Sequence, residues 1–226
     1  MELSSIKEFE TFVAKVVQPS ILDIESLGDA SRKHIQKLLY TNIVDRFDNT
    51  IDQLFLDNCL DPMLHDYALK GAEEPITQAQ LYRLLVSTIN IESAVKERFE
   101  AGIRQNILRE NHSQKVRSFL RICVAESNGH LDKPRVKFEG EIVDVFKPQK
   151  GSKMPPSIVG YADWLYSRRN SIVHGSGTSS FLSSDKSRLK KIFKVDVTTS
   201  KISLSSCKTA VKFYTSFFDL VKTNIV

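Results

Sequence analysis

Hydrophobic positions recur every three or four residues along most of the chain, a spacing that predicts amphipathic α-helices. The first periodic stretch predicts a helix over residues 2–17, which Pro19 should end because proline disrupts a helix interior. A longer apolar stripe predicts a helix over about residues 30–58, and the last periodic stretch predicts a helix over about residues 206–223. These segments indicate a helical bundle.

Capping residues predict further helices in the middle of the chain. Asp61-Pro62 should begin a short helix that Lys70-Gly71 ends, since proline favours the first helical turn and glycine the residue after the last. Thr77 and Gln80 have the spacing of a capping box, which predicts one helix from Thr77 to about Ile107.

Two more helices follow the same logic in the second half of the chain. Asn111 or Ser113 should cap a helix that extends to about Val124. Ser157 should cap another helix over about residues 158–173, which the glycine-rich segment after it ends.

Two stretches depart from the helical pattern. Residues 127–156 are rich in glycine and proline, which predicts a long irregular insertion, and its segment 138–146 fits either a short helix or a strand. Alternating apolar residues over 194–204 predict a small β-hairpin. We therefore expect an all-α bundle over residues 1–226, a single domain with one insertion.

Composition narrows the class of protein. The chain has 226 residues, of which 41% are hydrophobic and 26% charged, so it can form a real core and wholesale disorder is not expected. No apolar run approaches the ~20 residues of a membrane span, and the acidic N-terminus does not resemble a signal peptide, so we expect a cytoplasmic protein. The three cysteines are far apart, which favours buried thiols over a zinc site, and we expect no metal or cofactor.

A net charge of +5 permits binding to a polyanion without establishing it. The densest basic segment spans residues 186–194 and includes Lys190 and Lys191. Such a segment is commonly a solvated helix face or loop, and the alternative is a patch that contacts phosphates.

The segment 158–175 carries the strongest candidate chemistry. Arg169 falls on the apolar stripe of the predicted helix, so it is either a structural strut paired with a carboxylate or a reactive group. His174 comes just before Gly175, so it is either a C-cap at the negative end of the helix dipole or a reactive imidazole. On a straight helix the two side chains lie about 140° apart. They can share one ligand only if the helix ends near Val173 or a second chain completes the site.

Asp48 is a further anomaly, because it lies among apolar residues on the core-facing side of the predicted 30–58 helix. A carboxylate there needs a cationic or hydrogen-bonding partner. Arg169 and His174 are both candidates for that partner, and the alternative is that Asp48 lies at the rim of a wider apolar stripe.

The sequence Arg169-Asn170-Ser171-Ile172-Val173-His174, followed by Gly175, resembles the motif of the HEPN superfamily. In that motif an arginine and a polar residue precede a histidine at the end of a helix. Arg168 also fits the spacing, but the polar Asn170 favours Arg169 as the motif arginine.

Residues 38–48 are similar to the early helix of prokaryotic HEPN nucleases of the RiboL-PSP type, which often carries an acidic or polar residue near the active cleft. Asp48 is the best match to that residue, and the resemblance covers about residues 30–225. It implies an all-α bundle that forms a homodimer with a composite cleft. It also implies a metal-independent endoribonuclease with a role in toxin–antitoxin or phage-defence systems, and an antitoxin protein as a possible partner.

The chemistry of RNA suits such a site. The 2′-hydroxyl attacks the adjacent phosphate, an imidazole exchanges protons near neutral pH, and a guanidinium binds the phosphate oxygens. The predicted catalytic residues are Arg169, His174, Asn170 and Asp48, and the predicted substrate-binding residues are Arg168, Lys190 and Lys191.

Two other readings stay open. One is a non-catalytic HEPN-like module that binds RNA or a partner protein through the same basic surface. The other is a structural helical dimer with its polar residues buried in internal pairs. The sequence names neither the RNA target nor an activating signal.

Overall fold

The computed structural model describes residues 1–69, 77–87, 90–124, 131–149, 151–175, 180–198 and 201–225. The chain is predominantly helical over these ranges, which confirms the prediction of an all-α fold. No helix among them combines the length and the apolar character that crossing a membrane requires.

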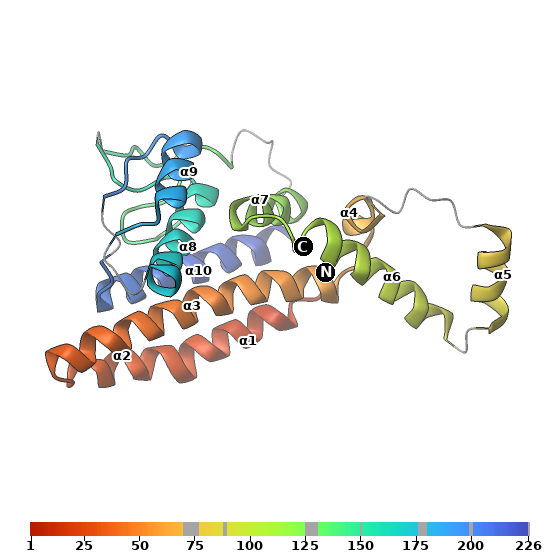
Figure 1. The fold of residues 1–226 in the computed structure, drawn as a ribbon, viewed down its shortest axis with the longest axis horizontal. Helices are drawn as coiled ribbons and strands as arrows, with labels where there is room; N and C mark the ends of the chain where they lie inside the picture. Colours follow the sequence, from red (N-terminus) through yellow and green to blue (C-terminus); the bar gives the residue numbers. More distant parts are fainter. Residues whose placement is uncertain are drawn as a thin grey trace.

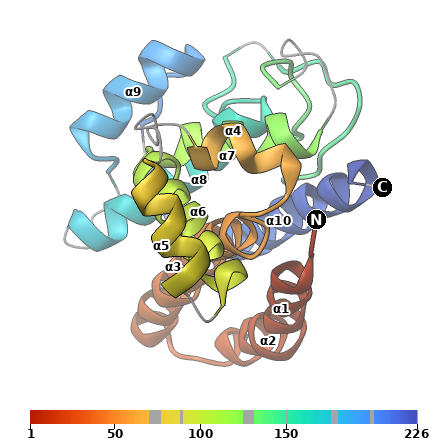
Figure 2. The same cartoon turned by 90° about the vertical axis from the view of Figure 1, so that its right-hand side faces the viewer.

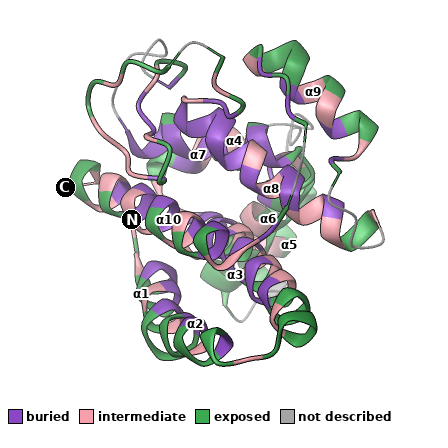
Figure 3. Cartoon of the chain, turned by 90° about the vertical axis from the view of Figure 1, so that its left-hand side faces the viewer, coloured by how far each residue is buried: buried purple, intermediate pink, exposed green. Residues whose placement is uncertain are grey.

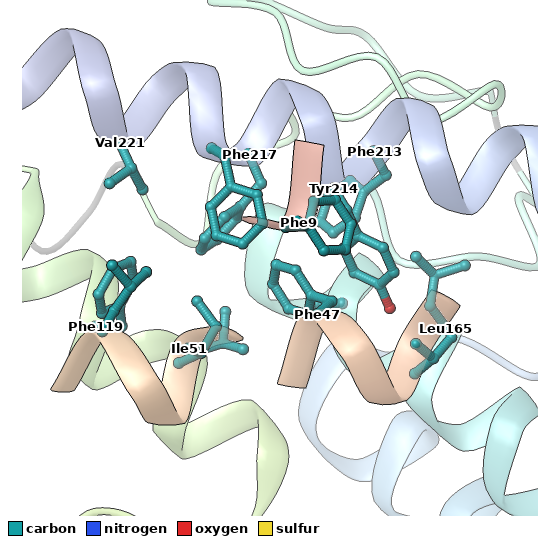
Figure 4. Close-up of a cluster of buried hydrophobic side chains, with 14 of the residues drawn as sticks. Phe9, Phe47, Ile51, Phe119, Leu165, Phe213, Tyr214, Phe217 and Val221 are labelled. Atoms are coloured by element: carbon teal, nitrogen blue, oxygen red, sulfur yellow. The ribbon is translucent and has the colours of Figure 1, made fainter. Parts of the chain in front are cut away.

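Two long helices form the centre of the molecule. Helix α3 (Asp29–Asp57) and helix α10 (Leu204–Asn224) run side by side, and aromatic side chains fill the space between them (Figures 1 and 4). The ring of Phe47 stacks on Tyr214 with 3.9 Å between centroids, and Phe217 meets Phe47 edge-on at 5.2 Å. All three rings are fully buried, so the apolar stripes that the sequence predicts on these two helices meet in the core.

The N-terminal segment packs along α3 at the lower edge of Figure 2. It comprises α1 (Ser4–Phe12), a π-helical turn η1 (Val13–Val17) and α2 (Gln18–Glu25). Pro19 lies in the first turn of α2, so the prediction that it ends the helix is wrong. The wider π turn comes where the proline ring would otherwise meet the carbonyl four residues earlier, and the chain therefore stays helical.

Helices α7 (His112–Cys123) and α8 (Ile158–His174) pack against each other and against α3. Asn111 caps α7 by accepting from the backbone of Gln114, and Ser157 caps α8, as the sequence predicts. In Figure 3 most of α7 and much of α8 are coloured as buried.

A short helical turn η2 (Pro62–Leu64) and helix α4 (His65–Leu69) follow α3. The side chain of Asp61 accepts a hydrogen bond from the Met63 backbone, which confirms the predicted start of this helix. The predicted end at Lys70-Gly71 lies outside the described residues.

The predicted helix from Thr77 to Ile107 is two helices, α5 (Gln78–Ser87) and α6 (Ile91–Asn106). The capping box of Thr77 and Gln80 is present. Asn90, however, has an extended backbone and caps α6 through its side chain, so the single-helix prediction is wrong. Figure 1 shows α5 at the far right, beyond α6 and away from the body of the protein.

The insertion is irregular in its described part, residues 131–149 and 151–156, as predicted. An isolated antiparallel bridge joins Val136 and Ile142 there. Segment 138–146, which fitted a helix or a strand, therefore forms neither a helix nor an extended strand.

The hairpin predicted over 194–204 is wrong, since residues 194–198 and 201–203 form no strand. Val195 and Val197 pack in a small cluster with helix α9 (Ser183–Phe193), whereas Ile202 packs in the main core. The two halves of the segment thus pack against different clusters, and the alternation of apolar residues does not come from pairing between two strands. Figures 2 and 3 show α9 and the described insertion on opposite sides of the top of the molecule.

Candidate functional site at the end of helix α8

Helix α8 distributes its side chains among several neighbours. Tyr161 and Leu165 are fully buried in the main core. Asp163 points toward α9, and Arg169, almost two turns further on, points toward α3. Residues on different faces of one helix contact different elements, so the last turns of α8 place polar groups against both α3 and α9.

The guanidinium of Arg169 forms a bidentate pair with Asp45 of α3. Its Nε donates to Oδ1 at 2.7 Å and its Nη2 donates to Oδ2 at 3.2 Å. The pair is partly open to solvent, with 20% of the Arg169 side chain and 42% of the Asp45 side chain exposed. Arg169 therefore has a carboxylate partner, as expected, but that partner is Asp45 and not Asp48.

Asn170 links this pair to α9. Its Oδ1 accepts from Nη1 of Arg169 at 3.4 Å, and its Nδ2 donates to Asp185 at 3.4 Å. Asp185 is buried and also binds Arg188, which in turn binds Asp163. The polar residue that follows the motif arginine thus joins a network that spans α3, α8 and α9.

His174 is the last residue of α8, and its side chain is exposed. Gly175 follows as the C-cap, with its backbone donating to Ser171. Within the described part of the chain no hydrogen bond or ion pair involves the imidazole. Its ring is therefore accessible from solvent at the end of the helix.

Asp48 belongs to a separate cluster between α3 and α7. Its Oδ1 lies 2.8 Å from Nδ1 of His112 and 2.8 Å from Nζ of Lys115. Lys115 also binds Asp52, one turn further along α3. His112 and Lys115 are almost fully buried, so Asp48 pairs with two interior side chains and contacts neither Arg169 nor His174.

The protonation equilibria of this cluster follow from burial and pairing. Burial raises the pKa of Asp48, but its hydrogen bonds and charge interactions with His112 and Lys115 outweigh burial and lower the pKa from 3.8 to about 2. Burial dominates at Asp52, whose pKa is raised despite Lys115. The pKa of Lys115 rises because its two carboxylate partners outweigh the opposing effect of burial.

The three predicted substrate-binding residues have different surroundings. Arg168 is buried, donates to the carbonyl of Lys201 and lies over the ring of Trp164 with 4.6 Å to its centroid. Lys190 and Lys191 are exposed on α9, where Lys190 binds Asp196 at 3.2 Å. The structure does not bring these three side chains together with His174.

Sequence reasoning missed four residues that contact either Arg169 or Asp48: Asp45, His112, Lys115 and Tyr166. Tyr166 stacks on His112 with 4.2 Å between rings and also lies 5.8 Å from the guanidinium carbon of Arg169, so it separates the Arg169 pair from the Asp48 cluster. The available signal was the spacing of Asp45, Asp48 and Asp52, which places three carboxylates on one face of α3.

Comparisons with protein-family models, with curated proteins and with solved structures found no match. Among the described residues no group of three or more His, Cys, Asp or Glu side chains is arranged to hold a metal ion.

Proposed function

We propose that the protein is an endoribonuclease of the HEPN type, with Arg169 and His174 as its reactive pair. The observation that carries the proposal is the accessibility of both groups at one end of α8. His174 is exposed at the helix terminus, and Arg169 lies at a partly open surface less than two turns before it. A phosphodiester can therefore reach each of them from solvent.

Each group has a defined chemical role in this proposal. An imidazole accepts the proton of the 2′-hydroxyl as that oxygen attacks phosphorus, and an imidazolium donates a proton to the departing 5′-oxygen. Three of the five N–H groups of Arg169 donate to Asp45 and Asn170, which leaves two for the charge on the phosphorane oxygens. The products are a 2′,3′-cyclic phosphate and a 5′-hydroxyl, and DNA, which has no 2′-hydroxyl, is not cleaved.

The angular separation of Arg169 and His174 supports a site shared between two chains. Five residues along a regular helix turn the second side chain about 140° from the first. Asn170 bridges Arg169 to Asp185 on the α9 side, so the side chains of α8 in this region are already committed to neighbours within the chain. In a homodimer, Arg169 of one protomer and His174 of its partner can converge on one phosphate.

The decisive experiment incubates purified protein with total RNA in EDTA and maps the cut ends. We expect 2′,3′-cyclic phosphate ends from the parent protein and none from His174→Ala. His174 is exposed, and its imidazole forms no hydrogen bond or ion pair with the described residues. The free energy of unfolding of this variant should therefore lie within about 0.5 kcal/mol of the parent value. His34→Ala, which removes another exposed histidine from α3, is the matched control and should cleave like the parent.

Arg169 requires two variants, since it also contacts Asp45. Arg169→Ala removes the charge and the fork, whereas Arg169→Lys keeps a charge that cannot bind a phosphate in the same bidentate way. Both should lose cleavage. Parental cleavage by His174→Ala would refute the proposed mechanism.

A second candidate function is a non-catalytic module that binds RNA or protein, and the occupied guanidinium of Arg169 favours it. On this alternative RNA binds without being cut, and Arg169→Ala loses stability while His174→Ala changes nothing. The two candidates thus differ in the response to the histidine substitution.

A further inference from the structure

A groove in two adjoining parts lies on the insertion side of α8 and is lined by basic and aromatic side chains. The first part, of about 750 Å³, lies within the insertion, and the second, of about 300 Å³, lies beside residues 197–209. Phe138, Lys153 and Trp164 line both parts, which together form the Trp164 groove.

The charge of the Trp164 groove is strongly one-sided. Its described lining includes five cationic side chains and one carboxylate, Glu139. The cations are Lys137, Lys147, Lys153, Arg168 and Lys201. Lys137 binds Glu141, and Arg168 is buried against a carbonyl, but Lys147, Lys153 and Lys201 are exposed and no ion pair is recorded for them in the described chain. A groove with three such lysines complements a polyanion.

The aromatic residues add a second, independent feature. Phe138 has 77% of its surface exposed, although burial of a phenylalanine is strongly favourable. Its backbone is nevertheless positioned by the fold, because the hydroxyl of Tyr161 donates to its carbonyl at 3.2 Å and the Gly140 N–H donates to the Lys137 carbonyl across the turn that contains Phe138. An exposed ring on a backbone anchored in this way is available to stack on a flat ligand.

Trp164 completes the aromatic surface. The guanidinium of Arg168 covers its ring at 4.6 Å from the centroid, and the indole lines both parts of the groove. The exposed ring of Phe138 therefore lies in the same groove as lysines that form no salt bridge with the described residues. Aromatic rings beside cationic side chains are the combination that proteins use for single-stranded nucleic acid, with bases stacked on the rings and phosphates near the cations.

We propose that the Trp164 groove binds single-stranded RNA, with a base stacked on Phe138 and the backbone along Lys147, Lys153 and Lys201. This inference rests on the proposed function, since it identifies the conformation of RNA that reaches the reactive pair. Trp164 and His174 are ten residues apart on α8, which is about 15 Å along the helix axis. A strand of a few nucleotides can span that distance, whereas a duplex presents no free base to Phe138.

The test measures binding apart from cleavage. Fluorescence anisotropy follows a labelled, unstructured single-stranded RNA added to His174→Ala protein, and the same RNA annealed to its complement is the comparison. We expect the single strand to bind more tightly than the duplex. Phe138→Ala in this background should weaken single-strand binding roughly 5- to 160-fold, the range for loss of one stacked base. Tyr82→Ala, which removes an exposed aromatic ring from the distant α5, should not.

The contribution of the lysines can be measured separately, from the salt dependence of the Kd for RNA. Lys153→Ala should lower the slope of log Kd against log salt by about 0.7, the value for one phosphate contact on a single strand. Lys7→Ala, on the exposed face of α1, is the matched control and should leave the slope unchanged. Phe138 and Lys153 are exposed, so both variants should fold as the parent does.

The outcomes separate this inference from the proposed function. Equal binding of duplex and single strand, parental affinity of Phe138→Ala, or equally good competition by polyglutamate would overturn the groove proposal while leaving cleavage by His174 intact. Absence of cleavage by the parent protein, with Phe138-dependent binding retained, would instead overturn the nuclease and keep the groove.

Discussion

Replacing Asp48 with asparagine tests whether this carboxylate stabilises the fold. Asp48 accepts hydrogen bonds from His112 and Lys115, whose side chains are 2% and 5% exposed. Asparagine keeps the size of the side chain but removes its charge. Lys115 then retains Asp52 as its one recorded carboxylate partner, and that carboxylate is itself harder to ionise because burial raises its pKa.

The expected magnitude follows from the pKa of Asp48. A fall from 3.8 to about 2 corresponds to about 2 kcal/mol of stability at neutral pH. Removing one partner of a buried ion pair costs about 3–5 kcal/mol when the other charge is left alone. Because Asp52 still binds Lys115, we expect a loss between the first estimate and the bottom of the second, about 2–3 kcal/mol, in the free energy of unfolding.

The stabilising contribution of Asp48 should depend on pH in a defined direction. The folded-state pKa of Asp48 is lowered, so its contribution is fully present above its unfolded pKa near 3.8 and is lost as the pH falls through about 2. The difference in stability between the parent and Asp48→Asn should therefore be constant near neutral pH and shrink between about pH 4 and pH 2.

Urea denaturation followed by the fluorescence of Trp164, the single tryptophan, measures both effects. Asp23→Asn, at an exposed position on α2, is the control and should change the unfolding free energy by less than about 0.5 kcal/mol. A parental unfolding free energy for Asp48→Asn at neutral pH would refute the reasoning. Parental stability combined with lost RNA cleavage would return Asp48 to the catalytic residues.

Three substitutions test other contacts by the same denaturation assay. Arg188→Ala leaves the carboxylate of Asp163, which is 1% exposed, without its cation, and should cost about 3–5 kcal/mol; a loss below 1 kcal/mol would contradict a buried pair. Gly102→Ala places a Cβ 2.0 Å from the carbonyl oxygen of Ala68, so it should push α4 from α6 and destabilise by about 1–3 kcal/mol, and unchanged stability would show that the helices can separate freely. Tyr214→Phe removes a buried hydroxyl for which the described chain offers no hydrogen-bond partner, so this variant should be as stable as the parent or up to about 2 kcal/mol more stable, whereas a clear loss would reveal a hidden partner.

The sequence predicts those parts of the fold that depend on neighbouring residues. Ser157 and Asn111 cap the helices expected of them because a cap involves only the next three residues. The predicted helix boundaries at Pro19 and Asn90 are wrong because they depend on local backbone conformation. A π turn before Pro19 preserves the helix, and an extended residue at Asn90 ends one, and neither is visible in hydrophobic periodicity.

The hairpin failed because alternation was read as pairing between strands. Val195 and Val197 are buried beside α9, and Ile202 is buried in the main core. Period-two burial arises whenever an extended segment lies on a surface, so the pattern identifies buried positions without identifying the partner. Only tertiary packing determines whether the partner is another strand or a helix surface.

The candidate site shows the same limit. Arg169 and His174 stand out in the sequence, but Asp45 and Asp48 lie one turn apart on the same face of α3 and are equivalent in any pattern. The crossing of α8 and α7 over α3 assigns Asp45 to Arg169 and Asp48 to His112 and Lys115. Sequence spacing contains no information on that crossing.

Two arginine–carboxylate pairs that join α8 to its neighbours differ in a way that bears on the proposed catalysis. Arg188 binds Asp163, whose side chain is 1% exposed, so releasing that arginine would leave a buried charge at a cost of several kcal/mol. Arg169 binds Asp45, whose side chain is 42% exposed, and a pair so open to water is worth about 0.2–1 kcal/mol. An incoming phosphate can therefore share or replace Asp45 at little energetic cost, since water solvates the released carboxylate. The carboxylate partner of Arg169 is thus compatible with a phosphate-binding role, which the partner of Arg188 is not.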